Sequence, residues 1–276
     1  MRQTYTREQR HICGSCYQEV DIYTVTQAEH RASLRAKKRA ASKLVQQNAN
    51  AARAERYLVQ LVNTNFDAAG VHMTLTYREE QLPDSPQAAE HLLELFLRRV
   101  RARCAQQGAA APKYIAVTEY RQEEESGALA VRYHHHVILS CALGRDELED
   151  LWRAPGKGGE RLGTVNADRL QPERGSLERL CRYLIKYPNR KRRWKQSRGL
   201  KKPDRPRPND TRYSRHQTEK IVRTCLYDRS FWEKQYPGWN FSEVSSSWNE
   251  WTGHHITLKL WRPPQPPKAA RERRRA

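Results

Sequence analysis

Alternating apolar and polar positions predict strands in the middle of the chain. Residues 71–77 read VHMTLTY, residues 113–120 read KYIAVTEY and residues 131–140 read VRYHHHVILS, and β-branched and aromatic residues are frequent in all three. The polar, glycine-containing segment between the last two suits an antiparallel hairpin with a long loop. A further strand is expected around residues 163–171, after a glycine-rich linker.

Helical periodicity follows the first of these strands. Ser85 and Pro86 open a helix as its N-cap and first residue. An apolar face repeats along it at Leu92, Phe96 and Val100, while arginines occupy the remaining positions. That face should pack on a sheet.

Two shorter helices complete the pattern. One is acidic and covers residues 145–152, and the other covers residues 176–187 with Ser176 as its N-cap. The order is therefore strand, helix, strand, strand, helix, strand, helix. It predicts an α+β fold in which flanking helices cover an antiparallel-rich central sheet.

The flanking segments differ from this centre in composition. Residues 27–62 contain many Ala, Arg, Lys and Gln residues and neither Gly nor Pro, which predicts a basic helix. A basic, proline-rich stretch that is unlikely to be compact follows the last helix, and Trp and Tyr return over residues 212–262. We therefore expect a basic helical N-terminal region over 1–66, a catalytic domain over 67–203, and a Trp-rich C-terminal extension with a disordered basic tail over 204–276.

Charge indicates the class of partner. The chain of 276 residues carries 51 Lys and Arg against 31 Asp and Glu, a formal net charge of +20. Such a field attracts polyanions, so nucleic acid is the expected partner, and the helix over 27–62 either lies along DNA or is only solvated. The sequence offers no apolar run of the length of a membrane span or secretory signal. We therefore expect a cytoplasmic protein with no membrane partner.

The cysteines are expected to be thiols in a reducing compartment, because six of them spread over a chain of this length form no dense disulfide framework. Cys13 and Cys16 have the spacing of a zinc knuckle, but no second pair follows. Zinc binding at this pair therefore stays open.

Three consecutive histidines in the 131–140 strand favour a metal site. Because side chains alternate across a strand, His134 and His136 share one face and His135 points to the other. Glu119 can add an oxygen ligand if the register of the neighbouring strand places it opposite the pair. Such a site leaves positions for water and a substrate phosphate. The alternative is that the histidines are ordinary strand or surface residues.

The 176–187 helix carries a candidate nucleophile. Tyr183 and Tyr187, four residues apart, share a flank beside its buried stripe, and Lys186 lies toward solvent. A phenol is a poor nucleophile at neutral pH, so it needs a metal-polarised phosphate, a nearby cation or a base. Taken alone, the pattern is equally typical of a boundary tyrosine beside an exposed lysine.

The order of four features along the chain resembles the HUH endonucleases. These features are a strand reading MTLTY, the strand with Glu119, a strand reading RYHHHVIL and a helix reading YLIKY. The resemblance is specifically to the rolling-circle replication-associated proteins of small single-stranded DNA phages and related plasmid or prophage elements, over roughly residues 60 to 203. It implies an enzyme that nicks single-stranded DNA at an origin by tyrosine attack, forms a 5′-phosphotyrosine and rejoins strands.

The resemblance also implies a role for each candidate residue. It makes His134, His136 and Glu119 ligands of Mg²⁺ or Mn²⁺, Tyr183 the nucleophile of a YxxK motif and Lys186 its accessory cation. Some members use two tyrosines in turn, and the spacing permits Tyr187 as the second. The residue between the two histidine ligands, usually hydrophobic in the family, is His135.

The expected partners follow from what the chain lacks. GKGG at 156–159 does not match a phosphate-binding loop, so a host helicase is expected to unwind the origin and a host DNA polymerase to extend the 3′ end. Relaxases and single-strand transposases share this chemistry on related folds. A non-enzymatic, basic nucleic-acid-binding protein is the alternative from a different class.

Overall fold

The chain forms two compact units. The computed structural model describes residues 4–26, 43–123, 129–156, 158–186 and 193–264. Unit 1 combines residues 1–52, 173–176 and 203–276, and unit 2 combines residues 53–172 and 177–202. None of the helices in the described part is long and apolar enough to cross a membrane.

Unit 2 is built on a five-stranded sheet. Its strand order is β6-β3-β5-β4-β7, and every neighbouring pair is antiparallel. The strands are β3 (Val71–Leu75), β4 (Lys113–Gln122), β5 (Leu129–Ser140), β6 (Val165–Arg169) and β7 (Lys195–Gln196). The hairpin of β4 and β5 occupies the centre of the sheet, so residues on these two strands are held by neighbours on both sides.

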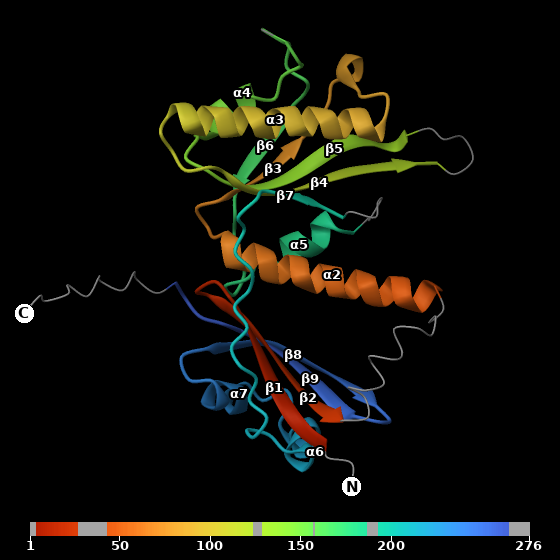
Figure 1. Ribbon diagram of the computed structural model, residues 1–276, viewed down its shortest axis with the longest axis vertical. Helices are drawn as coiled ribbons and strands as arrows, with labels where there is room; N and C mark the ends of the chain where they lie inside the picture. Colours follow the sequence, from red (N-terminus) through yellow and green to blue (C-terminus); the bar gives the residue numbers. More distant parts are fainter. Residues whose placement is uncertain (1–3, 27–42, 124–128, 157, 187–192, 265–276) are drawn as a thin grey trace, which may run out of the picture. The chain divides into compact units, whose positions relative to one another are not determined.

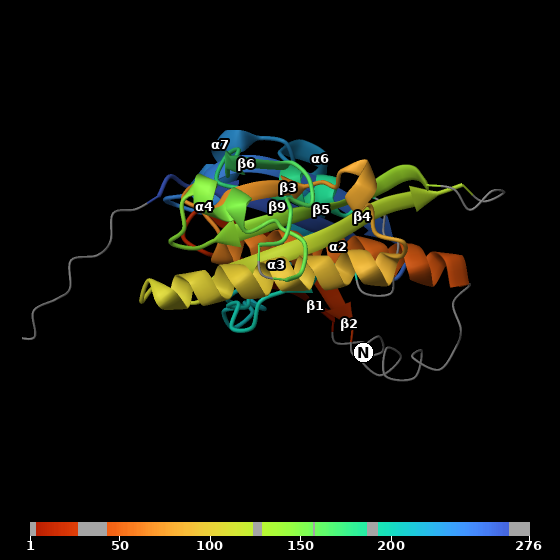
Figure 2. The ribbon, with the colours of Figure 1, turned by 90° about the horizontal axis from the view of Figure 1, so that it is seen from above.

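Helices cover both faces of this sheet. The long α3 (Pro86–Gln106) runs across one face, together with α4 (Arg145–Asp150), and α5 (Glu178–Leu184) and the second half of α2 (Lys43–Asn65) lie on the other (Figures 1 and 2). A short 3-10 helix, η1 (Glu79–Gln81), follows β3. The core on the α3 side is large and includes Phe96 and Trp152, which are both completely buried.

Unit 1 contains a four-stranded antiparallel sheet in the order β1-β2-β9-β8. Its elements are β1 (Thr4–Cys13), β2 (Tyr17–Thr26), α6 (Arg215–Thr224), α7 (Arg229–Gln235), β8 (Asn240–Asn249) and β9 (Gly253–Trp261). A second core joins β2 and β9 to α6 and α7 through Ile22, Ile221, Trp232 and Leu258. Both ends of the chain therefore contribute to one unit.

The α+β fold with an antiparallel central sheet is confirmed. All four predicted strands are present as β3, β4, β5 and β6, and α2 confirms the predicted basic helix from Lys43 onward. Residues 27–42 of that helix and the basic tail over 265–276 lie outside the described residues. The strands β1 and β2 lie where only a basic helical region was expected. The boundaries 1–66, 67–203 and 204–276 stay a prediction.

One of the two predicted N-caps is confirmed and the other is wrong. Ser85 caps α3, because its side chain accepts a hydrogen bond from the Ala88 amide at 3.1 Å. Ser176 does not cap α5. Its backbone forms a bridge with Glu173, and α5 begins two residues later with Leu177 at the capping position. The Leu177 amide is instead satisfied by the Asn63 side-chain oxygen at 2.8 Å.

The segment after the tyrosine helix is more ordered than its composition predicts. β7 pairs with β4, and the backbones of Asp204 and Asn209 form bridges with Ile12 and Glu8 of β1. Backbone hydrogen bonds of this kind need no apolar side chains. A basic, proline-rich sequence therefore gives no sign of them.

Candidate active site

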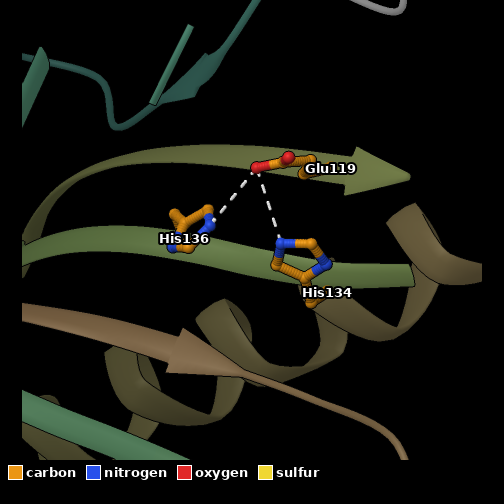
Figure 3. Close-up of side chains that lie close together, drawn as sticks. All are labelled: Glu119, His134 and His136. Atoms are coloured by element: carbon orange, nitrogen blue, oxygen red, sulfur yellow. Dashed lines mark ion pairs between the residues drawn. The ribbon is translucent and has the colours of Figure 1, made fainter. Parts of the chain in front are cut away.

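Glu119, His134 and His136 form a compact cluster on the central hairpin of unit 2. The register pairs Glu119 of β4 directly with His134 of β5, and alternation brings His136 to the same face. One carboxylate oxygen, Oε2, lies 3.5 Å from Nε2 of each histidine (Figure 3). The pairing of β4 and β5 is irregular immediately after Glu119, as in a β-bulge, a feature that often re-aims side chains at active sites.

Hydrogen bonds at the other ring nitrogens orient both imidazoles. His134 Nδ1 lies 2.9 Å from the Arg132 carbonyl oxygen. His136 Nδ1 lies 3.3 Å from both His72 Nε2 and Thr74 Oγ1, which come from the neighbouring β3. Metal-binding histidines are commonly held in this way, with one nitrogen hydrogen-bonded and the other left for the ion.

The donor set fits a divalent metal ion. His136 is 2% exposed, and its Nε2 is a buried atom with no hydrogen-bond partner in the described part of the chain. Burial, with smaller effects from His134 and His72, lowers the His136 pKa to about 3, so the ring is neutral and can act as a ligand. Two ligands of one cation lie about 3 to 3.5 Å apart. The 3.5 Å separations within the cluster agree with this.

His135 has a different role from its neighbours. It is completely buried, and its two nitrogens lie 2.6 Å from the Tyr77 hydroxyl and 2.9 Å from the Thr118 hydroxyl. Its ring packs edge-on to Trp152 in the core on the α3 side. The prediction that His135 faces away from the His134 and His136 pair is therefore confirmed.

Tyr183 lies beside the cluster. It projects from α5 with its ring centroid 5.2 Å from that of His136, at an interplanar angle of 75°, and remains 52% exposed. Lys186 is exposed in the turn after α5, where its amide donates to the Tyr183 carbonyl oxygen at 3.4 Å. Tyr187 lies outside the described residues. The structure thus brings Tyr183 to the histidines from a helix far away in sequence.

His72 and Thr74 were not among the residues expected at the site. They lie on the strand predicted over 71–77, two positions apart and so on one face. Alternation therefore placed them together, but only the β3–β5 register, which pairs Thr74 with His136, shows that they contact a histidine.

The Cys13 and Cys16 pair is not part of a metal-binding group in the described ranges, where the acidic and histidine cluster on β4 and β5 alone has the necessary proximity. The Cys13 thiol is buried and donates to the His11 carbonyl oxygen at 3.6 Å. His11 itself contacts Asp21 at 3.2 Å.

The fold and the cluster together define a class. An antiparallel sheet with flanking helices, carrying two histidines and a carboxylate that could hold a metal ion, is consistent with an HUH endonuclease-like protein. Residues 70–192 match the family model for the replication-associated protein ORF2. This match confirms the resemblance to rolling-circle replication initiators and supports a role in DNA replication. No curated protein and no solved structure matches the chain.

Proposed function

We propose that this protein nicks single-stranded DNA at a replication origin, with Tyr183 as the nucleophile, and rejoins strands during rolling-circle replication. The observation that carries the proposal is the position of Tyr183, whose ring contacts His136 while half of its surface is open to solvent. A nucleophile must reach a phosphate held next to the metal ligands, and a buried tyrosine could not.

The reaction is a transesterification. The Tyr183 oxygen forms a bond to phosphorus while the bond between phosphorus and the 3′ oxygen breaks. The phenol loses its proton, the leaving 3′ oxygen gains one, and the 5′ phosphate stays on the tyrosine. The reverse reaction with a new 3′ hydroxyl would circularise the displaced strand.

The chain's own residues prepare this step. Glu119, His134 and His136 would hold Mg²⁺ or Mn²⁺, and such an ion would polarise the scissile phosphate and offset the poor nucleophilicity of a phenol. Packing against His136 limits the directions available to the Tyr183 ring. Lys186, three residues on, would add a positive charge close to the phosphate, and Tyr187 is proposed only as a second nucleophile.

The biological setting is part of the proposal. A 3′ hydroxyl released by nicking is a primer end for a host DNA polymerase, and a host helicase would open the duplex. Both would act in the cytoplasm. The family match supports replication rather than conjugation or transposition, the other settings in which this chemistry occurs.

A covalent-adduct assay tests the nucleophile directly. The purified protein, Mn²⁺ and a pool of single strands from the surrounding replicon should give a protein–DNA adduct that survives denaturation, since a phosphotyrosine diester is covalent and ionic contacts are not. Peptide mapping should place the nucleotide on Tyr183. The variant Tyr183→Phe should lose the adduct.

Two further variants make the result specific. Tyr227→Phe, at another exposed tyrosine, should keep full adduct formation, and Tyr187→Phe should keep the first nick. An adduct that persists in Tyr183→Phe and disappears in Tyr187→Phe would assign the nucleophile to Tyr187. A wild-type protein that binds the strands and forms no adduct with either metal would instead be a non-enzymatic binding protein.

A further inference from the structure

A cavity of about 700 Å³ lies in unit 2 between α3 and the edge of the sheet formed by β7. From α3 it is lined by His91, Glu94, Arg98 and Arg101, which recur at intervals of three and four residues and so form one stripe along the helix. The apolar side chain of Leu97, 5% exposed, lies beside them. This stripe faces solvent as well as the sheet edge.

The opposite wall of the cavity comes from β4 and the segment around β7. It includes Tyr114, Lys195 and Arg198. The tyrosine is held in place, because its backbone amide and carbonyl both bond to Ser197, at 3.1 and 2.9 Å. Its ring packs against the core on the α3 side. The cavity thus has a fixed aromatic residue between two sets of basic residues.

The charge of the lining is strongly positive. Glu94 is the one acidic residue among the described residues that line the cavity, and its carboxylate is paired with Lys195, which lowers the Glu94 pKa. Arg98, Arg101 and Arg198 are exposed, and no ion pair to them is found in the ranges that the structure describes. Three unneutralised guanidinium groups around one cavity favour a ligand with several negative charges.

The cavity is separate from the metal cluster. Tyr114 and Glu119 both lie on β4, and five residues of a strand span about 16 Å. Tyr114 belongs with the α3 side of the sheet, whereas Glu119 shares the opposite face with His134 and His136. Variants of the cavity should therefore leave the cluster intact.

We propose that this cavity binds the phosphodiester backbone of a single DNA strand and holds it at a distance from the cleavage site. Arginine is suited to phosphate because it presents a planar fork of donors, and an aromatic ring adds a surface on which a base can stack. The identity of the strand as DNA rests on the proposed function. The presence of a polyanion site rests only on the cavity and its charges.

The test measures binding without cleavage. Affinity for a single-stranded thymidine oligonucleotide is measured in EDTA at several salt concentrations, with Tyr183→Phe as the parent protein. The double variant Arg98→Gln/Arg101→Gln should bind about tenfold more weakly at 0.1 M salt. Its plot of log affinity against log salt should be shallower by about 1.4, because each contact to a single strand contributes about 0.7.

Matched single variants separate the cavity from general charge. Arg101→Gln and Arg198→Gln, from the two walls, should each weaken binding, whereas Arg103→Gln, exposed on α3 but outside the cavity, should have little effect. Melting temperatures should agree among all variants. Equal effects of Arg101→Gln and Arg103→Gln would overturn the proposal, as would arginine-dependent binding of thymidine monophosphate with unchanged oligonucleotide affinity. Failure of the adduct assay would leave this result unaffected, because no cleavage is measured.

Discussion

The ring of Tyr183 lies edge-on to the ring of His136, with centroids 5.2 Å apart. The contact joins α5 to β5, two elements separated by a long stretch of the chain, and it places the candidate nucleophile next to a candidate metal ligand. Because the contact is made by the ring, Tyr183→Phe should preserve it. We expect the free energy of unfolding of this variant to lie within about 0.5 kcal/mol of wild type, as measured by chemical denaturation. A larger loss would mean that the hydroxyl has a structural role.

The metal cluster predicts a direct binding result. Glu119→Gln keeps the shape of the side chain and removes its charge, so it should weaken Mn²⁺ binding by more than about 100-fold, since even partners outside the ligand set contribute about 10- to 100-fold. Electron paramagnetic resonance of free Mn²⁺ gives the affinity without any activity assay. The control Glu123→Gln, exposed just past the end of β4, should bind as wild type does. Equal affinities for both variants would contradict the assignment of Glu119.

His72 and Thr74 predict a smaller effect at the same site. If His136 Nε2 is the ligand, its Nδ1 carries the proton and donates toward His72 Nε2 or Thr74 Oγ1, each 3.3 Å away. His72→Ala and Thr74→Val should each lower Mn²⁺ affinity by roughly tenfold, because the ring loses part of its orientation. His216→Ala, at an exposed histidine in unit 1, serves as the control. Unchanged affinity in both β3 variants would show that these contacts do not orient the ligand.

The central sheet could be predicted from sequence because its strands alternate around an apolar core. β1 could not be predicted in that way, since its buried positions are polar: Thr6 and Glu8 are each 3% exposed. Glu8 is stabilised by Arg212 at 3.0 Å and by the Tyr236 hydroxyl at 2.7 Å, and both come from more than 200 residues away. A hydrophobic pattern carries no information about partners of this kind.

The site was predictable to the extent that local periodicity determines it. Alternation in one strand assigns His134 and His136 to one face, and antiparallel pairing brings Glu119 opposite His134. The contact between Tyr183 and His136 depends on how α5 packs on the sheet. Only the resemblance to a family indicated it beforehand.

The N-cap of α3 predicts a stability effect. Ser85→Ala removes the acceptor of the Ala88 amide and should lower the free energy of unfolding by about 1 kcal/mol. Ser85→Asp retains an acceptor and adds a favourable charge at the helix N-terminus, so it should restore most of the loss. Urea denaturation of the protein, followed by circular dichroism, measures both. An alanine variant as stable as wild type would show that the cap contributes nothing.

The adjacent residues His134 and His135 predict opposite phenotypes. His135→Ala leaves a cavity in the core and removes the partner of the buried Tyr77 and Thr118 hydroxyls. We expect it to cost about 3 kcal/mol, and so to lower the melting temperature by about 10 °C. Well below that temperature it should still bind Mn²⁺, since its side chain points away from the cluster.

His134→Ala should do the reverse. Its side chain is 20% exposed, so the melting temperature without metal should change by only a few degrees, while Mn²⁺ affinity is lost. Mn²⁺ should raise the melting temperature of wild type and of His135→Ala, and should not raise that of His134→Ala, because a ligand stabilises only a fold that binds it. If Mn²⁺ stabilised His134→Ala and failed to stabilise folded His135→Ala, the metal would be bound from the other face of β5, and the proposed cluster would be wrong.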